Sequence, residues 1–252
     1  MVLLGDGVSM PRIGLGTYRM AEGGETETAV REALALGYRL LDTAKLYGNE
    51  RSVGRAVRAS AVPREEVFVT TKLWPTDFWR PERAFERSFE KLGLGYIDLY
   101  LVHFPIPFVP RNVWRTLERL YAEKRVRAIG VSNYSVAQLS ELLSWCSVPP
   151  AVNQVRFNPY AYKKDVLEFC QTHRIVLEAH TPLAEGRATR DPRITRIAQG
   201  HGRSPAQVAL RWALQHEAIV IPKSTRRERL AENVVLFDFE LSSEEMRALD
   251  ML

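Results

Sequence analysis

Short apolar runs alternate with longer segments of helical pattern along the whole chain. The runs are rich in β-branched residues, and eight of them are predicted to be strands: Ile13–Gly16, Arg39–Asp42, Val67–Thr71, Ile97–Val102, Ala128–Ser132, Ala151–Gln154, Val176–His180 and Ala218–Ile221. Strands that alternate with helices form parallel sheets, because each helix carries the chain back to the edge where the next strand begins. Eight such units are the number that closes a (β/α)8 barrel, the TIM-barrel fold.

The segments between the runs carry helix signals. Apolar residues recur at helical spacing in stretches such as Ala29–Leu34 and Val208–Leu214. Proline suits the first turn of a helix, and a serine hydroxyl can accept from the free N–H groups there. On this basis helices are predicted to begin at Pro81, Ser135, Ser204 and Ser242.

A doubly wound sheet is the structural alternative. Its dinucleotide turn would carry Gly-x-Gly-x-x-Gly, whereas Gly14-Leu15-Gly16 is followed by Arg19 at the third glycine position. A barrel runs to about 250 residues, and no linker-like segment interrupts the 252 residues here. We therefore predict a single barrel domain over residues 1–252. Before its first strand, Gly5-Asp6-Gly7 predicts the turn of a short β-hairpin that plugs the barrel bottom.

Composition argues against several other classes of protein. Apolar residues make up 46% of the chain and charged residues 26%, which is typical of a soluble globular protein. No run approaches the roughly 18 apolar residues of a membrane span, and the N-terminus lacks a basic signal region, so we predict a cytoplasmic protein. The net charge of +5 is dispersed among alternating signs and does not indicate a nucleic-acid partner. Neither Cys146 and Cys170 nor the five histidines show metal-ligand spacing, and no metal site is predicted.

Four ionisable side chains stand at or just after successive strand ends. Asp42 ends the second predicted strand, and Tyr47 lies in the loop after it. Lys72 follows the third predicted strand and His103 the fourth. Singly, each would be interpreted as a helix cap or a solvated side chain. Because the carboxyl ends of barrel strands form the active site, the four are expected to meet there and to form a proton-transfer site.

Tyr47 is the candidate acid of this site. The pKa of a free tyrosine is about 10, which is high for proton donation near neutral pH. A neighbouring ammonium lowers that pKa by favouring the phenolate, and a carboxylate beside the ammonium keeps it charged. We therefore expect Lys72 and Asp42 to lower the pKa of Tyr47, and His103 to orient the substrate oxygen or share the proton.

The segment Gly37–Glu50, which contains Asp42 and Tyr47, resembles the signature of the aldo-keto reductases. Further fragments stand in that family's order along nearly the whole chain: Gly14–Thr17, Thr71–Trp74, Asp98–His103, Gly130–Asn133, Asn153-Gln154 and Ile221–Ser224. The resemblance implies reversible, NADPH-dependent reduction of aldehydes or ketones to alcohols. It makes Tyr47 the general acid, Lys72 and Asp42 its tuning pair, and His103 the residue that orients the carbonyl.

The resemblance also implies where NADPH binds, extended across the barrel mouth without a Rossmann fold. Ser132, Asn133 and Gln154 match the positions that hold the nicotinamide carboxamide, and their amides and hydroxyl offer both donors and acceptors. Further cofactor contacts are implied at Gly16, Thr17, Asp42, His180, Thr181, Pro182 and Leu183, and contacts with adenine at Glu232 and Asn233.

A basic segment matches the family's site for the adenosine 2′-phosphate. It consists of Lys223, Ser224 and Thr225, followed by Arg229. Cations and hydroxyls near a helix N-terminus suit an anion, and arginine can grip phosphate with two hydrogen bonds. The segment therefore favours NADP over NAD.

The chain departs from the family pattern around the substrate. His180 stands where many members carry a tyrosine that stacks on nicotinamide, so the cofactor affinity is expected to be weaker or pH-sensitive. Phe104 and Tyr18 stand at positions where tryptophan is common. Together with Trp74 and His103 they are the expected substrate contacts.

Two segments near the pocket are short. The chain ends at Leu252, soon after its last predicted helix, where many relatives continue with a loop over the substrate. The stretch between His103 and Trp114 is also short and contains three prolines. An open pocket with a broad range of small carbonyl substrates is the resulting expectation.

Two other functions stay open. A regulatory protein would bind NADPH without turnover, but the complete four-residue set argues against it. A barrel isomerase or hydrolase would use the Lys223 region for a substrate phosphate, which leaves Ser132, Asn133 and Gln154 without a role. Nothing in the sequence indicates an oligomer, and a monomer is expected.

Overall fold

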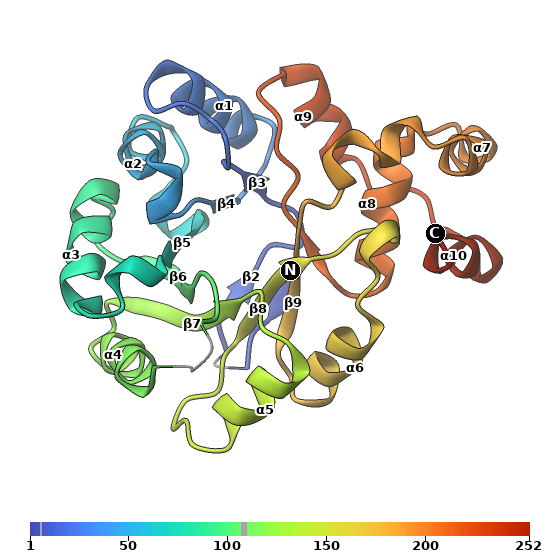
Figure 1. Cartoon of the computed structure of the whole chain (residues 1–252). Coiled ribbons are helices and arrows are strands. Elements are labelled where there is room, and N and C mark those ends of the chain that lie inside the picture. The colour runs from blue at the N-terminus through green and yellow to red at the C-terminus, as the bar shows by residue number, and fades with distance from the viewer. Residues whose placement is uncertain (6, 107–109) are drawn as a thin grey trace.

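The structure, a computed structural model, describes residues 1–5, 7–106 and 110–252. Within these residues, eight parallel strands form one sheet in chain order. Their bounds are β3 (Leu15–Gly16), β4 (Leu40–Asp42), β5 (Phe68–Leu73), β6 (Ile97–Val102), β7 (Val126–Ser132), β8 (Val152–Arg156), β9 (Val176–His180) and β10 (Ile219–Val220). Figure 1 shows these strands at the centre of a ring of helices.

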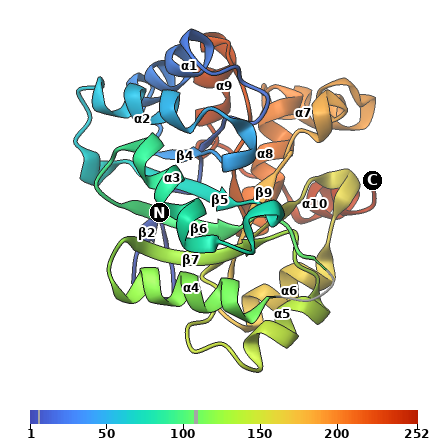
Figure 2. The same ribbon diagram turned by 60° about the vertical axis from the view of Figure 1, so that its left-hand side comes forward.

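The sheet closes into a barrel through its first and last strands. Ile13 forms a parallel bridge with Val220. The Gly14 N–H donates to the Val220 carbonyl at 2.9 Å, and the Val220 N–H donates to the Arg12 carbonyl at 3.0 Å. Helices α1 (Gly24–Ala35) and α9 (Arg227–Val234) lie side by side across this seam (Figures 1 and 2). The predicted (β/α)8 barrel is therefore confirmed.

The predicted strands agree with the observed ones to within two residues at either end. One difference bears on the site. The third strand was predicted to end at Thr71, whereas β5 continues to Leu73, so Lys72 lies within the strand and the prediction that it follows the strand is wrong. The backbone of Lys72 stays in register with Leu101 of β6 because its charged end finds partners inside the barrel.

Helices connect the strands and cover the outside of the barrel (Figure 2). Besides α1 and α9 they are α2 (Glu50–Arg58), α3 (Pro81–Leu92), α4 (Arg111–Ala122), α5 (Val136–Leu143), α6 (Lys164–Thr172), α7 (Pro192–His201), α8 (Pro205–Gln215) and α10 (Ser243–Asp250). Short 3-10 turns occupy Lys45–Tyr47, Arg64–Glu66, Pro75–Asp77, Pro159–Ala161, Ala184–Gly186 and Ala188–Arg190. Ser135, Ser204 and Ser242 each form a capping box, and Pro81 begins α3, which confirms the predicted helix starts.

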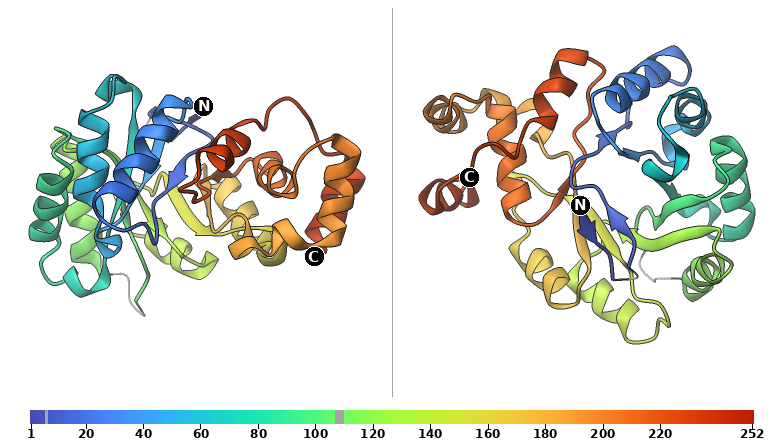
Figure 3. Two further views of the ribbon diagram at one scale, coloured as in Figure 1. Left: turned by 90° about the horizontal axis from the view of Figure 1, so that it is seen from above. Right: turned by 180° about the vertical axis from the view of Figure 1, so that it is seen from behind.

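The hydrophobic core has two layers, one between the strands and the helices and one inside the barrel. The inner layer includes Leu99 and Leu101 of β6, together with Leu4 and Met10 from the N-terminal hairpin. In this hairpin β1 (Val2–Leu3) pairs antiparallel with β2 (Ser9–Met10). Seen from behind in Figure 3, the hairpin lies across the centre of the barrel. The predicted plug at the barrel bottom is thus confirmed.

Some features of the sequence analysis fall outside the described residues. They include Asp6 of the predicted hairpin turn and Pro107, one of the three prolines after His103. In the part of the chain that the structure describes, no helix is long and apolar enough to cross a membrane. Within the same residues, no group of three or more His, Cys, Asp or Glu side chains is placed to hold a metal ion.

The plug gives a stability test within one hairpin. Met10 is fully buried, whereas Leu3 is 69% exposed. Met10→Ala leaves a cavity at the barrel bottom and should lower the free energy of unfolding by about 2–5 kcal/mol. Leu3→Ala, the matched control, should change it by less than about 0.5 kcal/mol. Urea unfolding of both variants checks this, and equal losses would contradict the plug.

Candidate active site

The site is a layer of polar side chains at the carboxyl end of the barrel. Successive residues of a strand point to opposite faces, so Lys72 points inward together with Phe68 of the inner core. Asp42 ends the neighbouring strand β4 and is 2% exposed, and Lys72 is fully buried. Two side chains from adjacent strands thus meet above the apolar interior.

All three N–H groups of the Lys72 ammonium have partners. Its Nζ donates to Asp42 Oδ1 at 2.7 Å, to the Thr43 carbonyl at 2.9 Å and to the Tyr47 hydroxyl at 3.2 Å. Burial lowers the pKa of Lys72, but Asp42 and Tyr47 more than offset this, so that pKa is raised overall. A charged lysine therefore lies between Asp42 and Tyr47, and these three side chains meet as predicted.

A buried amide holds the loop that carries Tyr47. Asn49 donates to the carbonyls of Thr17 and Met20 at 2.9 and 3.1 Å, and its Oδ1 accepts from the Thr43 hydroxyl at 2.7 Å. These bonds fix the backbone of Thr43, whose carbonyl accepts a hydrogen bond from Lys72. Asn49 was not predicted as a site residue, although it stands in the signature segment as a polar residue that turns out to be fully buried.

The environment of Tyr47 differs from the expectation in one respect. Lys72 lowers the pKa of Tyr47, as predicted, but burial raises it more strongly and Asp42 also raises it. The pKa is therefore raised to about 12. The prediction of a net lowering is wrong, because the loss of hydration around the phenolate outweighs the single ammonium.

His103 follows β6 and faces the tyrosine. Its ring centroid lies 5.6 Å from that of Tyr47 and 5.0 Å from that of Trp74, both edge-on. Burial, Lys72 and His180 lower the pKa of His103 to about 2. His103 is thus a neutral imidazole, which can donate one hydrogen bond to a substrate oxygen but brings no positive charge.

Asn133 and His180 form a polar pair beside this group. Asn133 donates to Ser132 Oγ at 3.0 Å and to the His103 carbonyl at 3.2 Å. His180 Nε2 lies 3.0 Å from Asn133 Oδ1, and its Nδ1 lies 3.0 Å from the Thr181 hydroxyl. Since an amide oxygen only accepts, Nε2 carries the proton and Nδ1 accepts from Thr181.

This pair also bears on pH sensitivity. Burial, followed by nearby cations, lowers the pKa of His180 to about 3. The ring therefore stays neutral throughout the physiological range. The expectation that His180 makes cofactor affinity pH-sensitive is not supported near neutral pH.

Gln154 joins Asp42 to a carboxylate that the sequence analysis missed. Its Nε2 donates to Asp42 Oδ2 at 2.8 Å and to Glu178 Oε2 at 2.6 Å. Both amide N–H groups are thereby used, and only the carbonyl oxygen of Gln154 can serve a ligand. Glu178 is fully buried in β9, two residues before His180 and on the same face of the strand. An acidic residue between the apolar Leu177 and Ala179 was the signal that could have found it.

The loop after β9 has a strained backbone. Thr181, Ala184 and Glu185 have φ angles of 55°, 49° and 56°, in the left-handed region. Such conformations cluster at ligand sites, where the surrounding structure holds them. Thr181, Pro182 and Leu183, predicted to contact the cofactor, lie at this bend.

The predicted phosphate residues lie at the start of α9. Lys223, Thr225 and Arg229 are exposed, and the buried Ser224 accepts a hydrogen bond from the Arg226 N–H at 3.1 Å. Arg227 differs from Arg229, because it pairs with Glu32 of α1.

Other predicted cofactor residues have structural partners. The fully buried Thr17 donates to the Asp42 carbonyl at 2.9 Å. A Cβ on Gly16 would approach the Ile221 carbonyl oxygen to 2.7 Å, so only glycine fits at this position. Glu232 accepts from the Ser204 hydroxyl, which ties α9 to α8, and Asn233 is buried.

Two of the predicted aromatic residues pack against Tyr47 or His103, and the third follows His103 in the sequence. Tyr18 lies 5.0 Å from Tyr47 between ring centroids and is 51% exposed. Phe104 is 48% exposed and follows His103 directly. Trp74 packs edge-on against His103. The site therefore has an exposed aromatic rim.

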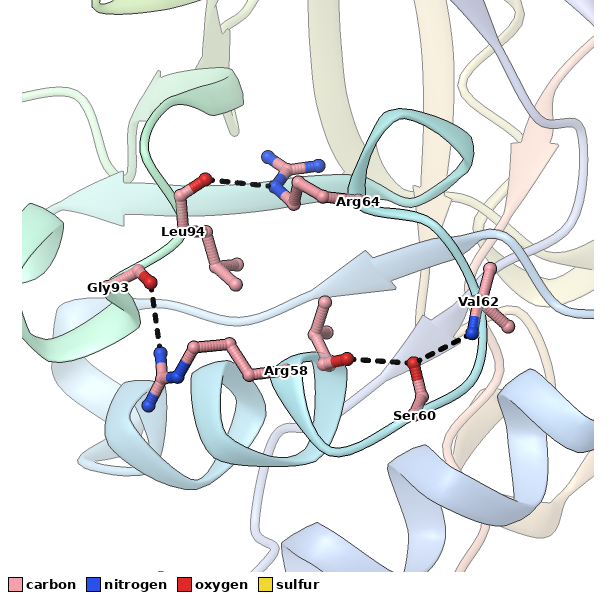
Figure 4. Close-up of a pocket in the computed structure, with 7 residues that line it drawn as sticks. Arg58, Ser60, Val62, Arg64, Gly93 and Leu94 are labelled. Carbon is pink, nitrogen blue, oxygen red and sulfur yellow. Dashed lines mark hydrogen bonds between the residues drawn. The ribbon is translucent and has the colours of Figure 1, made fainter.

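A hollow of about 250 Å³ is lined by the segments that lead into β5 and β6, and therefore lies towards the amino ends of these strands. Figure 4 shows the residues that line it. Arg58 and Arg64 line it, but their guanidinium groups donate to backbone carbonyls, including those of Gly93 and Leu94. This end of a barrel serves stability, and the hollow does not compete with the layer around Tyr47 as the site of chemistry.

Comparison with known proteins identifies the family to which the chain belongs. The sequence model of the Aldo/keto reductase family matches residues 12–252. The chain belongs to this family. Among its relatives, the 9,11-endoperoxide prostaglandin H2 reductase of Trypanosoma cruzi is 48% identical, over 100% of this chain and 90% of that protein. The glyoxal reductase of Bacillus subtilis is 45% identical, over 100% and 92%.

A solved structure agrees with this assignment. An aldo-keto reductase from a Medee basin deep-sea metagenome library superposes with a TM-score of 0.94 at 40% identity, over 100% of this chain and 95% of that one. This aldo/keto reductase is accordingly an oxidoreductase with the barrel of its relatives.

The neutral histidines give a test of the site. With pKa values near 2 and 3, His103 and His180 should keep constant NMR chemical shifts of their ring protons between about pH 5 and pH 8. The signals are assigned with His103→Asn and His180→Asn. If either histidine ring titrates between about pH 5 and pH 8, the two rings are more accessible to water than the structure indicates.

Proposed function

We propose that this aldo/keto reductase uses NADPH to reduce aldehydes or ketones reversibly to alcohols, with Tyr47 as the general acid. Residues 1–252 act as one NADP-binding oxidoreductase domain. One observation carries the proposal: a buried ammonium, held by Asp42, lies 3.2 Å from the hydroxyl of Tyr47. This arrangement supplies a proton donor, the Tyr47 hydroxyl, and a fixed positive charge beside it, the Lys72 ammonium.

Tyr47 donates the proton, and Lys72 stabilises the phenolate that the donation leaves on Tyr47. With its pKa near 12 the phenol is fully protonated at neutral pH. As the carbonyl is reduced, its oxygen becomes an alkoxide, which is a stronger base than a phenolate, so the proton moves from Tyr47 to the substrate. The Lys72 ammonium then faces the new phenolate, and Asp42 keeps the ammonium in place.

His103 orients the substrate. Its neutral ring lies next to Tyr47, so one N–H can donate to the carbonyl oxygen while the phenol approaches from the other side. A hydrogen bond of this kind strengthens as negative charge develops on that oxygen, which lowers the barrier. His103 thus positions the reacting atom without competing as an acid.

The residues present fit the cofactor. When bound, NADPH supplies the hydride. The Gln154 carbonyl oxygen, Asn133 and Ser132 are the groups that would hold the carboxamide, and His180 would support the ring. The strained bend at Thr181–Leu183 would contact the cofactor between its two ends.

The adenosine end of the cofactor, which carries the 2′-phosphate, is where we propose that NADP is preferred over NAD. Lys223 and Arg229 are exposed cations at the start of α9, where the helix dipole also favours an anion. They would bind the 2′-phosphate, with Ser224 and Thr225 beside them. Glu232 and Asn233 would lie towards the adenine, and Gly16, Thr17 and Asp42 towards the nicotinamide.

The substrate is proposed to be a small carbonyl compound. The aromatic rim of Tyr18, Trp74 and Phe104 would contact it beside His103, and the glyoxal reductase among the relatives supports such substrates. We further propose a cytoplasmic monomer with no nucleic-acid or membrane partner. The two free cysteines, Cys146 and Cys170, agree with a reducing compartment.

The role of Tyr47 is tested by Tyr47→Phe. Loss of the proton donor should reduce turnover of glyoxal or an aromatic aldehyde by about 10²–10⁴-fold. The NADPH dissociation constant, followed by fluorescence, should change little. Tyr121→Phe on α4 serves as the control. Retained turnover in Tyr47→Phe would exclude Tyr47 as the acid. If the wild-type protein binds NADPH but does not oxidise it in the presence of these substrates, a regulatory NADPH sensor would be favoured instead.

Cofactor choice is tested on one helix. Arg229→Ala should weaken NADPH binding about tenfold or more, because a charge-assisted bond to phosphate is lost, and should leave NADH binding unchanged. Arg227→Ala, whose arginine pairs with Glu32, should alter neither. Isothermal titration with both cofactors measures the difference. An equal loss for NADPH and NADH would contradict the 2′-phosphate site.

A further inference from the structure

Two buried carboxyl groups share one amide nitrogen in the polar layer of the site. Gln154 Nε2 bonds to Asp42 Oδ2 at 2.8 Å and to Glu178 Oε2 at 2.6 Å. Glu178 is fully buried, and its second oxygen, Oε1, has no hydrogen-bond partner among the described residues. The proposed chemistry of Tyr47 does not use this carboxyl group, so its presence needs a physical reason.

The charges around Glu178 are unequal. The titratable groups that act on it are Asp42 from β4 and Lys72 from β5, and Tyr47 feels its charge in turn. On its own sheet it lies between Gln154 of β8 and Ile219 of β10, which are both uncharged. One cation therefore faces two carboxyl groups.

Among the described residues, Lys72 is the cation that acts on Glu178, and its N–H groups already have other partners. The Lys72 ammonium lies 2.7 Å from Asp42 Oδ1 and uses its other N–H groups on Thr43 and Tyr47. A second carboxylate would be a buried charge with only one amide donor, and such a charge costs several kcal/mol. The cheaper state keeps a proton on one of the two carboxyl groups, and Glu178 is the one without a cation.

We propose that Glu178 is a positioning residue that works as a neutral carboxylic acid: through Gln154 it holds Asp42 against Lys72, and its ionisation weakens proton donation by Tyr47. The inference rests on the proposed role of Tyr47 as the acid. A neutral Glu178 leaves Lys72 with one carboxylate partner and free to face the phenol. An ionised Glu178 adds a second negative charge to the layer, which disfavours the phenolate that proton donation leaves behind.

The pH range of this effect follows from the site. Burial, and then Asp42, raise the pKa of Glu178 to about 8. Reduction should therefore slow above that pH and not below it. In the unfolded chain a glutamate ionises near pH ~4.3, so the folded state binds the extra proton between about pH 4 and pH 8, and stability falls as the pH rises through that range.

The test is Glu178→Gln, which keeps the side-chain shape and an oxygen for Gln154 but cannot ionise. Infrared difference spectra of the protein without cofactor should show a protonated carboxylic acid at pH ~6 in the wild type. This band should disappear above pH ~8 and be absent in Glu178→Gln. Glu168→Gln, an exposed change on α6, is the matched control and should keep the band.

Single-turnover reduction supplies the second readout, since cofactor release cannot mask the chemical step. The wild-type rate should fall about tenfold between about pH 7 and pH 9, the change in the protonated fraction of one acid that titrates near 8. Glu178→Gln should keep the neutral-pH rate at both values and lose less stability as pH rises. Glu178→Met, which cannot bond to Gln154, should be slow at both.

The outcomes separate the two proposals. Identical pH profiles in the wild type and Glu178→Gln, or no acid band, would overturn the role of Glu178 while Tyr47→Phe still tests the acid. An active Tyr47→Phe would overturn the proposed acid, yet the infrared band of the protein without cofactor would still decide the protonation of Glu178.

Discussion

The buried ion pair of Lys72 and Asp42 is the interaction on which the rest of the site depends. Removing an ammonium and a carboxylate from water costs several kcal/mol for each ion, and the attraction between them repays this only when the remaining donors are also satisfied. Here the three N–H groups of Lys72 meet Asp42, the Thr43 carbonyl and Tyr47. The pair is stable because the barrel brings all three acceptors to one point.

That requirement extends into the surrounding loops. The Thr43 carbonyl can accept from Lys72 only if its peptide is fixed, and Asn49 fixes it through the Thr43 hydroxyl and two carbonyls. Thr17 adds a bond to the carbonyl of Asp42. The first two loops at the carboxyl end therefore form one rigid unit, which holds the Tyr47 hydroxyl 3.2 Å from the Lys72 ammonium.

Much of this could be predicted from the sequence, because strand positions follow from local patterns. The alternation of apolar runs predicted the barrel, and the strand ends brought Asp42, Tyr47 and His103 to one face. The continuation of β5 through Lys72 could not be predicted from the local sequence. A buried lysine is too costly inside a strand unless a carboxylate pairs with it. That carboxylate comes from another strand.

The charge state of the site also lies beyond local patterns. The pKa of Tyr47 depends on how much water the closed barrel removes, and the Gln154 bridge depends on the distance between β4, β8 and β9. The role of Glu178 depends on the same distances. The sequence shows an acid between the apolar Leu177 and Ala179, but not that Gln154 joins this acid to Asp42 of another strand.

A raised pKa at Tyr47 is compatible with its proposed role as an acid once the base that receives the proton is considered. The pKa matters relative to the developing alkoxide, which binds a proton more strongly than the phenolate does. A phenol with a pKa near 12 is always loaded at neutral pH, and it still transfers its proton downhill. In the proposed reaction Lys72 stabilises the phenolate that forms after the transfer, and this is where a fixed ammonium lowers the barrier most. Any further negative charge in this layer would work against that stabilisation, and a second carboxyl group can be accommodated there only as long as it keeps its proton.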